Sequence, residues 1–125
     1  MESMQEEMRN RTKAFAIRIV RLCQRLPKTW EARIFGQQIL RSGTSVGANY
    51  RAAGRARSKA EFVAKIGTVV EEADETVFWL ELVVEAGIVG KVQMEGLLAE
   101  ANELVAIFAA AHGTARKHLR GSEAA

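Results

Sequence analysis

The stretch SKAEFVAKIGTVVEEADETVFWLELVVEAG, residues 58–87, contains the start, the apolar face and the end of one long helix. Ser58 and Glu61 form a capping box, in which the two side chains satisfy backbone N–H groups of the first helical turn. Gly87 is the residue type that most often follows a helix end. The stretch therefore predicts a helix over about residues 59–86. Its apolar residues recur at helical spacing: Phe62, Ile66, Val69, Val70, Ala73, Val77, Leu80 and Val84.

The same periodicity predicts two helices before this stretch. The first spans about residues 5–26 and ends at Pro27, because proline disfavours helical geometry in the residue that precedes it. The second spans about residues 30–54, with Thr29 as its N-cap. Two glycines in the middle of this second helix each cost about 1 kcal/mol relative to alanine. A helix that keeps such residues usually gains a close approach to a neighbouring backbone.

A fourth helix is predicted over about residues 91–112, and the tail, residues 113–125, is expected to be frayed. The three connections are short, which places consecutive helices side by side and antiparallel. The sequence therefore predicts a single all-α domain over residues 1–125, an up-down-up-down antiparallel four-helix bundle.

The composition is that of a globular domain rich in helix-forming residues, with one proline and one cysteine, Cys23, in 125 residues. A single cysteine excludes an intramolecular disulfide and suits a reducing compartment. Apolar runs are shorter than the ~18 residues that cross a bilayer, so we expect no membrane association. The first residues are acidic, unlike a signal peptide. We expect a cytoplasmic protein.

Charge is divided unequally along the chain. Residues 1–65 contain 14 Lys and Arg against 5 Asp and Glu, a net +9, whereas residues 66–125 contain 4 against 10, a net −6. Such asymmetry is informative about partners. The basic half favours phosphate or an acidic protein surface, and the acidic half can complement the basic half of a second copy.

Five short segments occur in a linked order along the chain: LPK (26–28), QILRSGTSVGAN (38–49), RSKAEF (57–62), EEADETVFWL (71–80) and AGI (86–88). Together they resemble the four-helix-bundle proteins of the 23S rRNA intervening-sequence family, over roughly residues 13–110. The resemblance implies a compact bundle that assembles as a ring, typically a homopentamer. Accessory proteins of diversity-generating retroelements share this fold and bind nucleic acid.

The chain departs from this family pattern at the end of the second predicted helix. Many relatives read Asn-Ile-Ala-Glu-Gly where this chain reads NYRAA, residues 49–53. The family's carboxylate is absent and Arg51 lies next to its place, which makes this part of the chain more basic.

The first candidate site is a basic stripe on the first predicted helix. At 100° per residue, Arg11, Arg18, Arg25 and Lys28 lie within about 40° of one another, and Arg21 lies beside them. Arginine presents a planar fork of donors that suits phosphate oxygens. We expect this stripe either to contact nucleic acid or to be a solvated face whose stems cover apolar surface.

The second candidate is the cluster Arg51, Arg55, Arg57 and Lys59 at the corner between the second and third predicted helices. Its cations meet beside the free N–H groups that open the third helix, where an anion is favoured. One interpretation is a phosphate clamp for RNA or DNA. The other is a set of salt bridges to the acidic third helix of a neighbouring subunit.

The third candidate is a small polar face on the second helix: Gln38, Ser42, Ser45 and Asn49, spaced by 4, 3 and 4 residues. A ligand pocket is one interpretation. We favour tight helix packing with hydrogen bonds to a neighbouring helix.

The residue types of catalysis and metal binding do not converge in the sequence. His112 and His118 have no partner ligands at metal-site spacing, so we expect no metal. The acidic run over residues 71–85 lacks the Glu-x-x-His pairs of di-iron bundles. Neither a nucleophile–histidine pair nor a Walker-type loop occurs. We expect no enzyme activity, no cofactor and no small-molecule substrate.

Two hypotheses follow from these patterns. The first is a non-enzymatic oligomeric bundle that binds nucleic acid, RNA before DNA, through its arginine-rich surface. The second is an assembly or adaptor protein without a nucleic-acid ligand, in which the basic half of one subunit docks the acidic half of the next.

Overall fold

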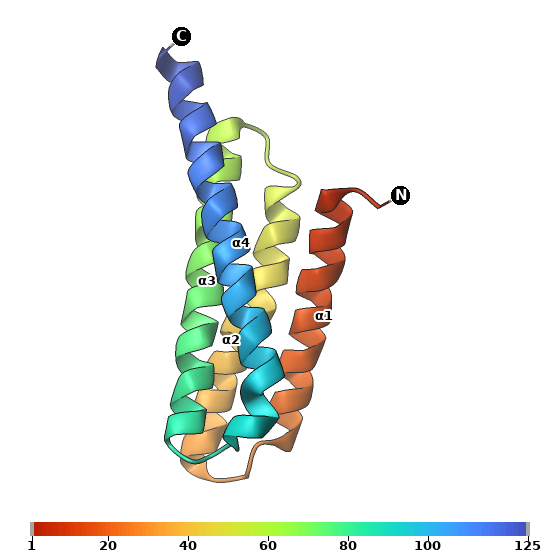
Figure 1. Cartoon of the computed structure of the whole chain (residues 1–125), viewed down its shortest axis with the longest axis vertical. Coiled ribbons are helices and arrows are strands. Elements are labelled where there is room, and N and C mark those ends of the chain that lie inside the picture. The colour runs from red at the N-terminus through yellow and green to blue at the C-terminus, as the bar shows by residue number, and fades with distance from the viewer. Residues whose placement is uncertain (1, 125) are drawn as a thin grey trace.

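The protein is a bundle of four helices in the computed structural model, which describes the backbone of residues 2–124 and the side chains of residues 2–122. The helices are α1 (Met4–Arg25), α2 (Trp30–Ala53), α3 (Lys59–Glu85) and α4 (Lys91–Ala124). Each packs antiparallel against the next in sequence, and α1 also meets α4 (Figure 1). The described residues contain no strand. The predicted all-α up-down-up-down bundle is confirmed.

Local signals in the sequence mark the helix ends. The hydroxyls of Thr29 and Ser58 accept hydrogen bonds from backbone N–H groups three residues later, at 3.3 and 3.0 Å. Leu26, before Pro27, has extended backbone angles and ends α1. Gly87 follows α3 with φ +75°, a left-handed conformation that suits glycine. The first three helices consequently begin and end within one residue of the positions expected from the sequence.

The fourth helix is longer than its sequence predicts. We expected its end near His112 and a frayed tail over residues 113–125, but α4 continues to Ala124. Gly113 has open space around it, and strong helix formers follow it before Gly121. This extension lies against the first turns of α3, where Lys59 Nζ donates a hydrogen bond to Ser122 Oγ at 3.1 Å. Residue 125 lies outside the described residues.

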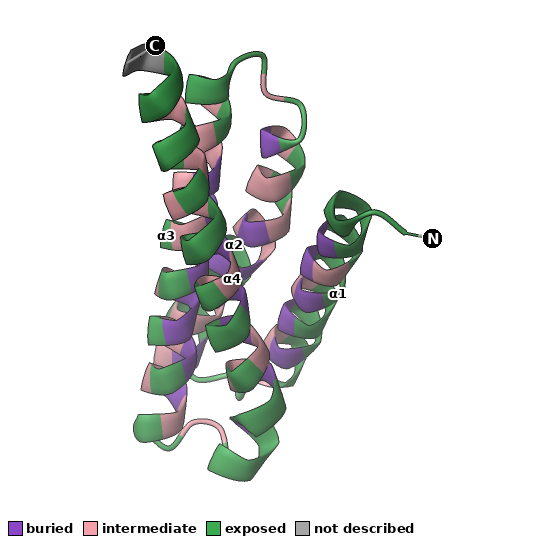
Figure 2. Ribbon diagram, turned by 45° about the horizontal axis from the view of Figure 1, so that its top comes forward, coloured by how far each residue is buried: buried purple, intermediate pink, exposed green. Residues whose placement is uncertain are grey.

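The core is a continuous apolar column enclosed by the four helices (Figure 2). Every helix supplies fully buried large side chains at helical spacing, as an apolar stripe on each helix requires. Two aromatic rings, Phe15 of α1 and Phe108 of α4, are among them, each 1% exposed. Burial of such side chains contributes about 1.5–3 kcal/mol each relative to leaving them in water.

Glycines in α2 bring α1 close. Gly43 is buried, and a Cβ built on it would lie 2.7 Å from Ile19 Cγ1 and 2.9 Å from Ile19 Cγ2. One turn further along, a Cβ on Gly47 would lie 3.3 Å from the carbonyl oxygen of Thr12. The glycines therefore lower the intrinsic helix propensity of α2 but allow α1 to lie directly on its backbone.

Replacing Gly43 with alanine should therefore destabilise the bundle even though alanine is the better helix former. Overpacking a filled core costs about 1–3 kcal/mol, and the helix preference for alanine offsets about 1 kcal/mol of it. We expect Gly43→Ala to lower the free energy of unfolding by up to about 2 kcal/mol, measured by urea denaturation. Gly113→Ala is the matched control, because no neighbour lies within 4 Å of the added Cβ. Equal stability of the two variants would contradict this account of α1–α2 packing.

Candidate nucleic-acid interface

The stripe predicted on α1 begins near the predicted corner cluster and ends at the opposite end of the bundle. Because α1 and α2 are antiparallel, the first half of α1 lies beside the second half of α2 (Figure 1). Arg9 and Arg25 are separated by about 24 Å along α1 at 1.5 Å per residue. The stripe on α1 therefore runs away from the corner that contains Arg55 and Arg57.

The corner cluster gains two cations from α1 that are distant from it in sequence. A groove of about 420 Å³ between α1 and α2 is lined by Arg9, Lys13, Arg51 and Arg55. Arg9 also lies near enough to Tyr50 to oppose the effect of burial, which raises the pKa of that phenol. Neither Arg9 nor Lys13 was among the predicted site residues, because only the antiparallel packing of α1 places them here.

The groove forms because the residues at its floor have small side chains, whereas the residues along its edges have long ones. The facing positions of α1 and α2 carry Thr12, Ala16, Thr44, Gly47 and Ala48. Arginine and lysine stems rise on either side of this narrow floor, a common arrangement for side chains that keep their charge in water. The groove is thus a shallow channel between cationic rims.

A second hollow, of about 450 Å³, continues the same surface around the α2–α3 corner. It is lined by Arg51, Arg55, Arg57 and Lys65, with Glu61 as its one acidic side chain among the described residues. The two hollows share Arg51 and Arg55. We refer to the six cations Arg9, Lys13, Arg51, Arg55, Arg57 and Lys65 as the corner surface.

The charges of the corner surface are not neutralised by ion pairs among the described residues of the protomer. The ion pairs within 4.0 Å in the described part of the chain involve other arginines, Arg11 and Arg41. Lys65 is partly buried, and the other five members are exposed. Six cations therefore lie in two connected hollows with one carboxylate between them.

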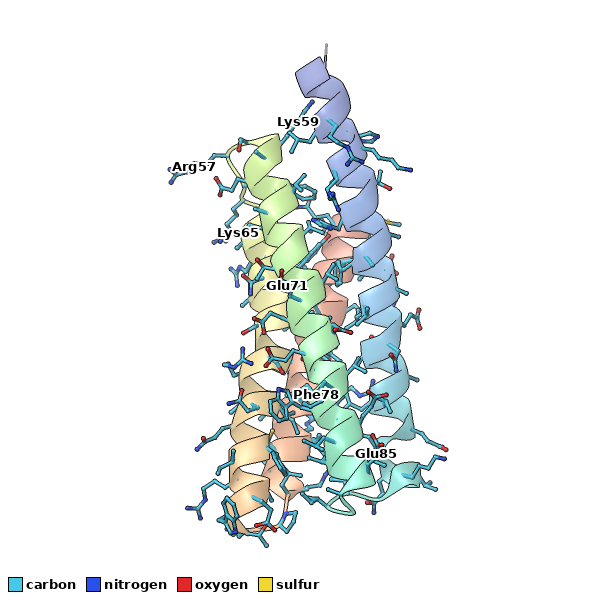
Figure 3. All side chains as sticks on the ribbon, turned by 90° about the vertical axis from the view of Figure 1, so that its left-hand side faces the viewer. Arg57, Lys59, Lys65, Glu71, Phe78 and Glu85 are labelled. Atoms are coloured by element: carbon cyan, nitrogen blue, oxygen red, sulfur yellow. The ribbon has the colours of Figure 1, made fainter. Side chains whose placement is uncertain are left out.

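Lys59, predicted with this cluster, faces a different neighbour. Its ammonium reaches α4, whereas Arg57 projects away from α4 and Lys65 lies on the side of α2 (Figure 3). The structure thus brings Arg51, Arg55 and Arg57 together around one hollow, and Lys59 is not part of its lining.

The predicted stripe on α1 is divided by α4. Arg11 makes a two-pronged contact with Glu100, with Nε to Oε2 at 2.8 Å and Nη2 to Oε1 at 2.7 Å, and reaches Glu103 at 2.9 Å. Hydrogen bonding to Arg11 lowers the pKa of Glu100. Arg18 lies beside α4, where a Cβ on Gly96 would be 3.3 Å from its Nη2.

The remaining members of the stripe, Arg21, Arg25 and Lys28, are exposed near the α1–α2 connection. They are a second, smaller basic surface, far from the corner surface. Two exposed apolar side chains on α1, Ile17 and Val20, accompany them.

The four side chains of the polar face predicted on α2 make hydrogen bonds to different partners. Ser42 is fully buried, and its hydroxyl is hydrogen bonded to that of Thr76 on α3 at 2.9 Å. Ser45 donates to the Arg41 carbonyl oxygen at 2.6 Å, and Asn49 donates to the Ser45 carbonyl oxygen at 2.9 Å. Of the four side chains, Ser42 is thus the one whose hydrogen bond reaches α3 directly.

Gln38, the fourth member of that face, orients an arginine that the sequence analysis did not select. Its Oε1 accepts from Arg41 at 3.3 Å, and the Arg41 guanidinium pairs with Glu72 and Glu75 of α3. Trp79 Nε1 also donates to Glu75, at 3.0 Å. This network holds α2 against α3 and neutralises one arginine of the basic half.

The described residues contain no group of three or more His, Cys, Asp and Glu side chains placed to hold a metal. Burial raises the pKa of the Cys23 thiol, which disfavours the nucleophilic thiolate. Among the described helices, none is both long and apolar enough to cross a membrane.

Comparisons with known proteins agree with the bundle geometry. A family model described as 23S rRNA-intervening sequence protein matches residues 4–110. A crystal structure from Bacteroides thetaiotaomicron, described as a protein of unknown function from the S23 ribosomal protein family, is 33% identical with a TM-score of 0.81. The alignment covers 87% of this chain and 97% of that one. No curated protein matches the sequence.

The Arg11 ion pair predicts a pH-dependent contribution to stability. Glu100 has a lower pKa in the folded than in the unfolded chain, so the contribution is complete above the ordinary glutamate pKa of about 4.3. It is lost as the pH falls through the folded pKa. We expect Arg11→Met to lower the free energy of unfolding by about 1–2 kcal/mol at neutral pH, and by less as the pH falls below about 4.

Urea denaturation at several pH values measures this difference. Arg21→Met is the matched control on the same helix, because Arg21 is exposed and makes no ion pair in the described part of the chain. A pH-independent difference between wild type and Arg11→Met would contradict the ion-pair explanation.

Proposed function

The chain belongs to the 23S rRNA-intervening sequence protein family, and from that premise we propose that it binds nucleic acid, RNA before DNA, through the corner surface. Binding would be non-enzymatic and would be carried out by an oligomer of the bundle. The observation that carries this proposal is the convergence of six cations, from three helices and the α2–α3 connection, around two connected hollows with one carboxylate.

The physical basis is the release of counterions from a polyanion. Each phosphate that a lysine or arginine neutralises releases condensed cations, which makes the affinity strongly dependent on salt. Arginines that already have a carboxylate partner, such as Arg11 and Arg41, contribute little to this effect. In the described part of the chain no member of the corner surface makes such an ion pair, so its charge is available to phosphates.

The residues around the hollows favour contacts to the nucleic-acid backbone. Neither hollow is lined by an aromatic side chain among the described residues, so stacking of bases has no platform there. Nearby Tyr50 packs on Phe108, with ring centroids 5.2 Å apart. Arginine forks instead suit phosphate oxygens, which position a strand without reading its sequence. We therefore expect weak sequence selectivity, and we propose a cytoplasmic location, where such a partner would be met.

The alternative function, assembly without a nucleic-acid ligand, has its own supporting observation. The outward face of α3 carries acidic side chains on either side of Phe78, such as Glu71 and Glu85 (Figure 3). Phe78 itself is 55% exposed. The exposed part of α1 carries the opposite charge, with Arg21, Arg25 and the apolar Ile17. A basic and an acidic face, each with apolar residues, can dock between two copies in a head-to-tail manner.

Assembly and RNA binding are compatible with each other, because they use different surfaces. The acidic face of α3 can complement the basic surface near the α1–α2 connection. The corner surface at the other end of the bundle then stays open to phosphate.

A salt titration with paired charge variants tests the RNA proposal. We expect Arg51→Ala/Arg55→Ala to weaken binding to single-stranded RNA, and to lower the slope of log affinity against log salt by about 1.4 units, since about 0.7 is lost per contact. The matched control is Arg33→Ala/Lys91→Ala, which removes the same charge at the opposite end of the bundle. Fluorescence anisotropy at several salt concentrations gives the slope.

A third pair, Arg21→Ala/Arg25→Ala, separates the two predicted basic groups. The proposal requires the corner pair to change the salt slope more than either of the other pairs. Equal slopes for all three variants would contradict a localised phosphate site.

Light scattering after size exclusion tests self-assembly. We expect the wild type to elute with the mass of several 13.8-kDa chains, five if the ring of the family resemblance applies. Phe78→Asp should shift the mass toward one chain, because it places a carboxylate among acidic neighbours at an apolar contact. Ala64→Asp, at an exposed position of the same helix, is the control. An unchanged mass for Phe78→Asp would remove this face from the assembly.

A further inference from the structure

A cavity lies at the end of the bundle, next to the corner surface, with which it shares Arg57. It has a volume of about 910 Å³ and lies between the α2–α3 connection, the first turns of α3 and the extension of α4. Pockets that hold small organic ligands typically measure about 300–1,000 Å³. The size is therefore suitable for one small molecule or for one terminal unit of a polymer.

The floor of this cavity is apolar. Phe62 and Val63 of α3 contribute the larger side chains, and Ala53, Ala56 and Ala115 contribute small ones. Phe62 is 37% exposed, so part of an aromatic ring faces the open space rather than the core. Such a surface is suitable for packing against a flat ring.

The rim of the cavity is cationic. Arg57 and Lys59 approach from the α2–α3 side, and Lys117 and His118 approach from α4. Ser122 accepts a hydrogen bond from Lys59 Nζ at 3.1 Å and holds that ammonium at the rim. The described lining residues include no carboxylate.

The α4 side of the cavity lies outside the region that the family model matches. The family model matches residues 4–110, so Ala115, Lys117, His118 and Ser122 lie beyond the matched region. Without the helical continuation of α4, Phe62 would have no facing wall. The cavity is thus not a property that membership of the family implies.

We propose that this cavity binds a nucleoside phosphate, with the base on Phe62 and the phosphate between Lys59 and Lys117. A purely apolar ligand would leave three cations without partners, and an inorganic anion would leave the apolar floor unused. A nucleoside phosphate satisfies both, because it joins a flat ring to a charged group. The terminal phosphate of an RNA strand and a free nucleotide share this chemistry.

The cavity also has a spatial relation to the proposed RNA surface, and this part of the inference rests on the proposed function. Arg57 lines both the cavity and the hollow at the α2–α3 corner. A strand that lies along the corner surface can therefore place its end in the cavity without leaving the protein.

Two measurements on the full chain test the proposal. The first compares the affinity of short single-stranded RNA bearing a 5′-phosphate, a 3′-phosphate or neither. The second follows backbone amide shifts of the labelled protein during titration with adenosine monophosphate, with adenosine and inorganic phosphate as separate controls. We expect a preference of about tenfold for one of the phosphorylated strands, or adenosine monophosphate shifts that cluster at Phe62 and Lys117.

A matched pair of variants locates the effect. Lys117→Ala removes a cation that lines the cavity, and Arg116→Ala removes its sequence neighbour, which does not line it. We expect Lys117→Ala to abolish the preference or the shifts and Arg116→Ala to retain them. Both variants should keep the helical circular dichroism of the wild type, because both replace an exposed residue with a strong helix former.

The outcomes separate this inference from the proposed function. A strand-end preference without an effect of adenosine monophosphate identifies the RNA end as the ligand, and shifts without a strand-end preference identify the free nucleotide. If RNA does not bind at all, the nucleotide titration still decides the question. Neither a preference nor shifts, or equal effects of Lys117→Ala and Arg116→Ala, would overturn the proposal.

Discussion

The close contact of α2 with both of its neighbours is the constraint on which the rest of the structure depends. Two consecutive residues at its middle, Ser42 and Gly43, are buried on adjoining sides. Ser42 bonds Thr76 of α3, and Gly43 leaves room for Ile19 of α1. No larger residue pair could serve both contacts, because a Cβ at the glycine already collides with α1. The position of α1 on α2 follows from this contact, and with it the place where the basic side chains of α1 come to lie.

Among the described residues, cations of the basic half are paired with carboxylates at the middle of the bundle but not at the corner surface. At the middle, carboxylates of α3 and α4 pair with arginines of the basic half, as Glu100 does with Arg11 and Glu75 does with Arg41. At the end that contains Arg51 and Arg55, the two hollows are lined by several cations and by one carboxylate among the described residues, that of Glu61. Charge that the protein neutralises internally ties helices together, and charge that it leaves unpaired is available to a partner. This difference supports the corner surface over the α1 stripe as the site for phosphate.

Local sequence signals predicted the fold well, because the signals for helix ends act over three or four residues. Ser58, Thr29 and Pro27 mark their helix boundaries without help from distant parts of the chain. The end of α4 was wrongly predicted for the complementary reason. Gly113 is a common stop signal, yet the helix continues because the residues after it are strong helix formers and lie against the start of α3. Local sequence signals therefore could not predict the wall of the end cavity that contains Lys117.

The sequence by itself determined the helices, their order and the excess of cations in the first half, since all three depend on composition and short-range periodicity. Only the tertiary structure decided which cations act together. Packing of α1 on α2 placed Arg9 beside Arg51 across a long separation in sequence, whereas Lys59, close to Arg57 in sequence, turned toward α4. The physical reason is that a helix distributes successive side chains around its whole circumference. Neighbours in sequence then face different partners, and the shared surface is set by which helices lie side by side.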